Sequence, residues 1–305
     1  MFYMICSIVC SGLLVCGLRV ALNGGIRPIR LNASFRFFGG VVVLLIFGWG
    51  AMMNDFPGGW KILVRLGLVS SLVYWLASYS SVEAQNMGHL GISTTVTYCS
   101  MIVPTLASII YWRELSFASI SLRTVMVLGG VLFICGAMCL LGFEKGAGKG
   151  NIDRAELKEA FHKKKWLLWL SVSFVTNGLW GVCMKMAQDV GGGGFMYLLY
   201  MACAMGGAGL ISLPVVMTHK NERFFSKKEI IFGVLLGLFA VGAVFLKLRA
   251  LKSMDGFIVF PITSIGVILL SVMAGKEFFG EKTGKLGMCG IVAAIIGICL
   301  ITIKV

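Results

Sequence analysis

Long apolar runs dominate the chain, and polar residues interrupt them at nearly regular intervals. Ten runs approach or exceed the roughly 20 residues that a helix needs to cross a bilayer. They cover residues 2–23, 34–53, 62–82, 90–112, 124–142, 166–187, 195–217, 230–251, 257–275 and 286–304. Apolar stretches of this length do not alternate as barrel strands do. The pattern therefore predicts an all-α polytopic membrane protein with ten transmembrane helices.

The composition excludes several other classes of protein. Of the 305 residues, 58% are hydrophobic and 13% are charged, and an average soluble domain has about twice this charged share. A soluble enzyme and a disordered chain are therefore excluded. Enzyme motifs such as a Walker loop or H-E-x-x-H are absent from the sequence. The ten cysteines lie in apolar runs without a CxxC pair, so we expect neither a metal site nor a cofactor.

The interruptions divide the chain into two halves. The longest polar segment, residues 143–165, lies near the midpoint and contains a charged stretch from Asp153 to Lys165 that we expect to be helical. We predict a first five-helix repeat at 1–142, an inter-repeat loop at 143–165 and a second five-helix repeat at 166–305.

The two halves resemble each other when one is shifted along the other. A shift of 167 places Glu114 on Glu281 and Gly130 on Gly297, and in each half the Glu precedes the last helix. Five spans per half is an odd number, so the second half enters the membrane from the opposite side. The halves are then inverted-topology repeats, the plan of secondary transporters with a substrate site at the repeat interface.

These features resemble the drug/metabolite transporter superfamily, and specifically its EamA-like ten-helix members. Two segments carry the resemblance: Ile109-Ile110-Tyr111-Trp112-Arg113-Glu114 through Gly130, and Phe278-Phe279-Gly280-Glu281 through Gly290 and Gly297. Pro28 followed by Arg36 also resembles the start of that family's second helix, and Phe260-Pro261 resembles the proline of its ninth helix. The resemblance implies transport of small metabolites without fixing the substrate.

Basic residues indicate an orientation. The net charge is +14, with 16 of the 27 basic residues in the connections 1–2, 5–6, 7–8 and 9–10, six on the other face and five within spans. Lys and Arg collect in cytoplasmic loops, so this count places both termini outside a plasma (inner) membrane. The family resemblance implies cytoplasmic termini instead. No basic domain stands outside the spans, so nucleic acid is not an expected partner.

Charged residues inside spans are costly and are therefore candidates for function. A shift of 166 places Arg19 on Lys185, and both could point into a central cavity; alternatively both snorkel to the interface. Lys247, deeper in its span, is a third candidate cation. Such cations would attract anionic or zwitterionic solutes. We interpret Arg36, near a helix start, as an interfacial anchor or a partner for a helix end.

Polar uncharged residues in the spans are further cavity candidates, and hydrogen bonding between helices is the alternative role for each. These candidates are Asn177, Tyr98, Thr94 and Ser264. Acidic residues are scarce in the spans, and only Glu83 and His89 stand out as candidates for proton coupling.

The sequence thus predicts a multi-pass secondary transporter or exporter of small metabolites that works by alternating access. Its expected partners are a small-molecule substrate and the lipid bilayer, and a homodimer stays open. The alternative is a non-transporting accessory protein or a binder of lipid headgroups. A polar cavity that reaches a buried cation would favour the transporter.

Overall fold

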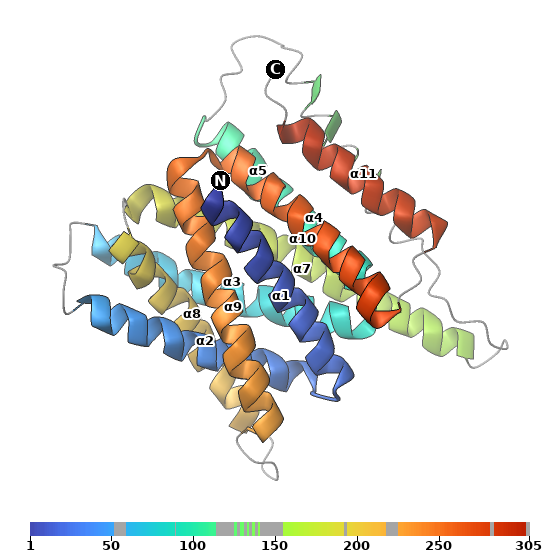
Figure 1. The fold of residues 1–305 in the computed structure, drawn as a ribbon, viewed down its shortest axis with the longest axis horizontal. Helices are drawn as coiled ribbons and strands as arrows, with labels where there is room; N and C mark the ends of the chain where they lie inside the picture. The colour runs from blue at the N-terminus through green and yellow to red at the C-terminus, as the bar shows by residue number, and fades with distance from the viewer. Residues whose placement is uncertain are drawn as a thin grey trace.

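The computed structural model describes residues 1–51, 59–88, 90–113, 155–191, 194–217, 225–280 and 284–302, together with short helical pieces between 125 and 140. Within these residues every regular element is a helix (Figure 1). Eight segments of the described chain are long and apolar enough to cross a membrane. The protein is therefore an all-helical, multi-pass membrane protein. The predicted span 124–142 lies mostly outside the described residues.

The first half contains five described helices. Their bounds are α1 Phe2–Asn23, α2 Pro28–Ala51, α3 Trp60–Met87, α4 Leu90–Cys99 and α5 Ile102–Ile110. One of them, α2, begins before its apolar run, and one run is divided into two helices. α2 begins six residues before the predicted run, because proline suits the first position of a helix. Gly25 and Gly59 have positive φ in the turns before α2 and α3, a conformation that glycine adopts without strain.

The predicted span 90–112 is one membrane segment built from two helices. Pro104 has no amide hydrogen, and its ring clashes with a carbonyl four residues earlier, which is that of Ser100. The chain responds with short turns: the Met101 amide donates to the Tyr98 carbonyl at 3.1 Å, and the Val103 amide donates to the Ser100 carbonyl at 3.0 Å. α4 therefore ends at Cys99 and α5 begins at Ile102.

The second half contains α7 Ala155–Gly191, α8 Gly194–Met217, α9 Lys227–Ser253, α10 Gly256–Phe279 and α11 Lys285–Thr302. α7 joins most of the predicted charged helix to the predicted span 166–187 without a break. α9 begins at a capping box, in which the Ser226 hydroxyl accepts from the Glu229 amide and the Glu229 carboxylate accepts from the Ser226 amide. Such a box satisfies two amides that a helix start leaves free.

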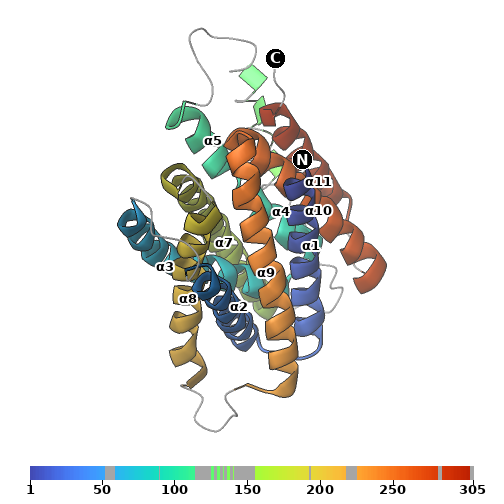
Figure 2. The same cartoon turned by 60° about the vertical axis from the view of Figure 1, so that its left-hand side comes forward.

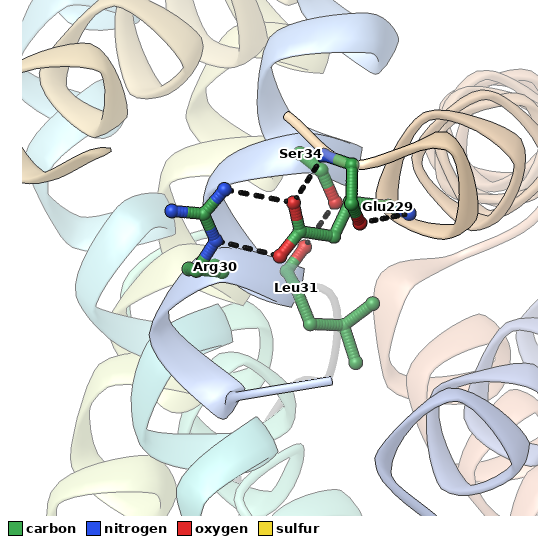
Figure 3. A network of polar contacts seen from close by, with 5 residues as sticks. Arg30, Leu31, Ser34 and Glu229 are labelled. Carbon is green, nitrogen blue, oxygen red and sulfur yellow. Dashed lines mark hydrogen bonds and ion pairs between the residues drawn. The ribbon is translucent and has the colours of Figure 1, made fainter. Parts of the chain in front are cut away.

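A buried ion pair joins the first turns of α2 and α9 (Figure 3). Arg30 donates from Nε to Oε1 of Glu229 at 2.6 Å and from Nη2 to Oε2 at 2.9 Å. Both side chains are more than nine-tenths buried. A bidentate pair of this geometry offsets the cost of burying the two charges.

Glycines let α2 approach its two neighbours closely. α2 packs against both α8 and α9, and α9 also packs against α1 (Figures 1 and 2). A Cβ on Gly237 would lie 2.7 Å from the backbone nitrogen of Gly39, and one on Gly40 would lie 3.1 Å from the Cα of Gly206. Backbone contact of this kind is typical of membrane helices that pack through small residues.

Candidate functional site

A cavity lies at the centre of the helices, between elements from both halves of the chain. Its lining comes from α1, α2, α3, α4, α7 and α9, and the space open to the centres of water molecules measures about 120 Å³. Two basic side chains, Arg36 and Lys247, line it. Among the described residues of the lining, none is Asp or Glu. The charge of the cavity wall is therefore positive.

The guanidinium of Arg36 lies over two aromatic rings. Its Cζ lies 3.6 Å from the ring centroid of Tyr74 and 4.4 Å from that of Phe35, distances at which cation–π attraction operates. Arg36 is 5% exposed, and its Nε and Nη1 have no hydrogen-bond acceptor among the described residues. The rings thus contact the guanidinium, and its Nε and Nη1 donors stay without an acceptor in the described part of the chain.

Lys247 is the second cation of the cavity. It is 7% exposed, and it lies six residues before α9 ends at Ser253. No hydrogen bond or ion pair joins it to any residue in the described part of the chain. A buried ammonium without a partner is costly in a protein interior, so Lys247 is suited to an anion that enters the cavity.

A stack of aromatic rings supports the Arg36 side of the cavity. The rings of Tyr74 and Trp180 are 4.3 Å apart and inclined by 29°, and the rings of Trp180 and Tyr200 are 6.0 Å apart and inclined by 15°. The hydroxyl of Tyr200, which is fully buried, donates to Oγ of Ser70 at 3.2 Å. Offset ring pairs of this kind stabilise packing beyond their buried area, so the stack anchors Tyr74 beneath the guanidinium.

Four polar side chains from α3, α4 and α7 form a hydrogen-bonded group that we call the hydroxyl cluster: Ser81, Thr97, Ser173 and Asn177. The Ser81 and Ser173 hydroxyls lie 2.9 Å apart, and those of Thr97 and Ser173 lie 3.0 Å apart. The Asn177 amide nitrogen donates to Oγ of Ser81 at 3.1 Å and to the Ser173 carbonyl at 2.8 Å. Ser81, Thr97 and Asn177 also line the cavity.

The structure brings some of the sequence candidates into this cavity and leaves others outside. Tyr98, Asn177 and Lys247 line it. Arg19 does not, since its Nη1 donates to the carbonyls of Gln85 and Gly88 at the end of α3. It acts there as a basic cap for a helix C-terminus.

The other three candidates also lie outside the lining. Lys185 donates to Oε1 of Gln188 at 3.0 Å and lies 5.9 Å from the ring centroid of Trp112. Ser264 donates to the Phe260 carbonyl of its own helix at 2.8 Å. Thr94 is buried, and its hydroxyl has no partner among the described residues.

The remaining candidates stand apart from the cavity or outside the described residues. The Glu83 carboxylate is half-buried and accepts from the Tyr79 hydroxyl at 2.9 Å. Gly130 and Gly297 are buried in helical segments. His89, Glu114 and Glu281 lie outside the described residues. In the described ranges, no three His, Cys, Asp or Glu side chains are placed to hold a metal ion.

The position of Arg36 differs from its interpretation as an interfacial anchor. Because α2 begins at Pro28, Arg36 lies eight residues, or about 12 Å, inside the helix. The signal in the sequence was Pro28 itself, a residue that favours the first turn of a helix. The apolar run starts later, because Arg30 and Asn32 interrupt it.

Comparison with known proteins identifies a family that part of the chain resembles. Residues 164–303 match the sequence profile of the EamA-like transporter family. This part of the chain is similar to an EamA-like transporter domain. That family is part of the drug/metabolite transporter superfamily, which the sequence motifs had indicated. The matched range overlaps the predicted second repeat, 166–305, almost completely.

Structural similarity extends beyond the EamA-like half. A solved structure described as "Crystal structure of protein" superposes with a TM-score of 0.61 over 98% of this chain and 94% of that chain, at 15% sequence identity. This likeness concerns the fold alone. No curated protein sequence matches the chain. The family match at residues 164–303 suggests a membrane transporter of small molecules, and proteins of the EamA family are generally not enzymes.

Proposed function

We propose that this protein is a secondary transporter that moves small organic anions across a membrane by alternating access. The observation that carries the proposal is the pair of buried cations, Arg36 and Lys247, in a cavity without an acidic lining residue among those described. Moving one ion from water into a protein interior costs several kcal/mol, on the order of this amount per charge, unless a partner replaces the lost hydration. An anionic substrate would supply that partner.

Hydrogen bonds to charged groups are strong enough to select such a substrate. Each is worth about 1.5–3 kcal/mol, so two contacts would favour a carboxylate or phosphate over a neutral solute by a factor of 100 or more, on the order of 3–6 kcal/mol. A planar guanidinium is well suited to bind a planar carboxylate through two parallel hydrogen bonds.

The lining itself supports the inverted-repeat arrangement that alternating access requires. Residues 166 positions apart line the cavity in seven pairs: Ser11 and Asn177, Leu14 and Trp180, Leu18 and Met184, Tyr74 and Ala240, Ala77 and Ala243, Ser78 and Val244, and Ser81 and Lys247. Helix contacts follow the same correspondence, since α1 packs on α9 as α7 packs on α3. Gly40 and Gly206, also 166 apart, meet each other directly.

The accessory-protein alternative receives less support from these residues. That alternative requires a dry interior with the cations at the membrane interface. Lys247 and Arg36 instead line an interior space large enough for water and a small solute. We extend the proposal to the repeat boundaries 1–142 and 166–305, and to termini outside a plasma (inner) membrane as the basic residues indicate.

A ligand screen by thermal unfolding tests the substrate class. The panel contains carboxylates, organophosphates, amino acids and neutral sugars, added to the detergent-purified protein. An acid present at 100 times its Kd stabilises the folded state by about 2.7 kcal/mol. We expect organic anions to raise Tm in the native protein and in Arg249→Met, but not in Lys247→Met.

Arg249 is the matched control, because it lies two residues from Lys247 on α9, contacts the Phe245 ring and is absent from the cavity lining. Stabilisation by neutral solutes alone would contradict the proposed charge of the substrate. Equal loss of the response in both variants would remove Lys247 from the site.

A further inference from the structure

The orientation of the Asn177 amide is fixed by the backbone around it. Its nitrogen faces the carbonyls of Ser173, at 2.8 Å, and Ala77, at 3.4 Å. Carbonyl oxygens only accept hydrogen bonds, so the amide nitrogen must occupy this side. Both amide hydrogens are then directed at the protein, and Oδ1 is the atom of Asn177 without a partner among the described residues.

The hydroxyl hydrogens of the cluster follow in a single order. Ser81 Oγ donates to the Ala77 carbonyl at 2.7 Å, which uses its only hydrogen. The contact between Ser81 and Ser173 therefore needs Ser173 as the donor. The contact between Ser173 and Thr97 then needs Thr97 as the donor. Every hydrogen of the hydroxyl cluster is thus engaged within the protein.

The hydroxyl cluster can therefore only accept hydrogen bonds from a molecule in the cavity. The free acceptors are Oδ1 of Asn177 and the remaining lone pairs of Thr97, and both residues line the cavity. Gln85 adds another, because it is 3% exposed, lines the same cavity, and its Oε1 has no partner among the described residues. All three come from α3, α4 and α7.

The two cations offer the opposite capacity. Arg36 and Lys247 carry donors only, and they come from α2 and α9. The repeat correspondence sharpens this contrast, because Lys247 occupies the position equivalent to Ser81 and Ser11 the position equivalent to Asn177. The place of Lys247, which only donates, is thus held in the other half by Ser81, a member of the hydroxyl cluster.

We propose that Asn177, Thr97 and Gln85 form an acceptor subsite, which binds a hydroxyl or amino group carried by an organic acid whose acidic group lies at Arg36 and Lys247. The substrate class is therefore hydroxy or amino acids. This inference rests on the proposed function, since it needs the anion to bind at the cations. A ligand without a donor group leaves the buried acceptors unpaired, and such sites discriminate strongly against the missing group.

Matched acids test the subsite by calorimetric titration of the full-length protein in detergent. Three series are used: succinate, malate and methoxysuccinate; propionate, lactate and 2-methoxypropionate; and phenylpropionate, phenyllactate and its O-methyl ether. In each series the acid lacks a donor, carries a hydroxyl, or carries an ether that only accepts. Aspartate and alanine provide the amino group.

We expect hydroxy or amino acids of at least one series to bind about tenfold more tightly than the matched unsubstituted acid, a difference of about 1.4 kcal/mol. The ether should bind no better than the unsubstituted acid. In Asn177→Leu this preference should fall to about twofold or less. Thr97→Val should reduce the preference in part and serves as a second variant if Asn177→Leu does not fold.

Thr176→Val is the matched control. It neighbours Asn177 on α7, its hydroxyl donates to the Val172 carbonyl at 2.7 Å, and it is absent from the lining; the preference should survive in it. Equal binding of hydroxy, amino and unsubstituted acids overturns the acceptor subsite. A preference that persists in both Asn177→Leu and Thr97→Val overturns it as well. Either result leaves the proposed function standing. No binding of any acid contradicts the proposed function as well.

Discussion

Replacing Lys247 with methionine should stabilise the empty protein and abolish its response to anions. Methionine keeps the length and the apolar contacts of the side chain and removes a charge that is 7% exposed and has no partner among the described residues. A charge at the centre of a membrane segment costs about 2.5–3.5 kcal/mol on insertion scales, and Lys247, six residues from the end of α9, costs less than this. Water in the cavity reduces this cost, so we expect a gain of about 1–3 kcal/mol.

The measurement is thermal unfolding of the native protein and the variant in the same detergent. A gain of this size corresponds to a rise in Tm of about 2–6 °C for a chain this long. Organic acids that raise the Tm of the native protein should leave the variant unchanged. Arg249→Met, the matched control, should keep the response to acids.

Opposite signs for stability and for ligand response are what distinguish a binding cation from a structural one. A lysine that holds helices together would lower Tm when replaced. A fall in Tm of Lys247→Met by several degrees would therefore refute the reasoning, even if the response to anions were also lost.

Three further predictions concern the same framework. Glu229→Gln should lower the free energy of unfolding by about 3–5 kcal/mol, measured as a fall in Tm, because it removes the carboxylate that pairs with the buried Arg30 at both oxygens; a change below about 1 kcal/mol would contradict the role of this pair. Gly237→Ala should also lower Tm, by an amount equivalent to about 1–3 kcal/mol, since the added Cβ meets the backbone of Gly39 at 2.7 Å; the matched Gly48→Ala, with open space at its Cβ, should not. Arg19→Met should weaken the end of α3 by about 1 kcal/mol and leave the Kd for organic acids unchanged; a tenfold loss of affinity in titration would place Arg19 in the site.

Hydrophobic runs located the membrane helices well, because lipid imposes length and apolarity on each span directly. The runs did not locate the starts of helices whose first turns carry charged residues. α2 and α9 both begin before their runs, since Arg30 and Glu229 neutralise each other across the two helices. The sequence could not supply that pairing, which joins residues 199 positions apart. The turn at Ser100 was likewise hidden within an apolar run, although Pro104 was its signal.

The cavity was harder to predict than the helices, because helix position alone does not determine which way a side chain points. Arg19 and Lys185 correspond by position in the two halves, yet neither lines the cavity: Arg19 donates to carbonyls at the end of α3, and Lys185 donates to Gln188 of its own helix. Lys247 and Asn177 line the cavity, as expected from their depth. The shift of 166 that relates Arg19 to Lys185 also relates Lys247 to Ser81, and both of these residues line the cavity. The repeat therefore indicated cavity positions even where the two halves carry different residue types.

Flux of an organic acid through reconstituted protein tests the central claim most directly. Proteoliposomes containing the native protein, Arg36→Met, Lys247→Met or Arg249→Met are loaded with unlabelled malate, and the uptake of radiolabelled malate is followed; succinate and lactate are measured in parallel. The account predicts saturable uptake of at least one of these acids by the native protein and by Arg249→Met, with a loss of tenfold or more in the two cavity variants. Uptake equal to that of empty liposomes for every acid, or undiminished uptake in both cavity variants, would contradict it.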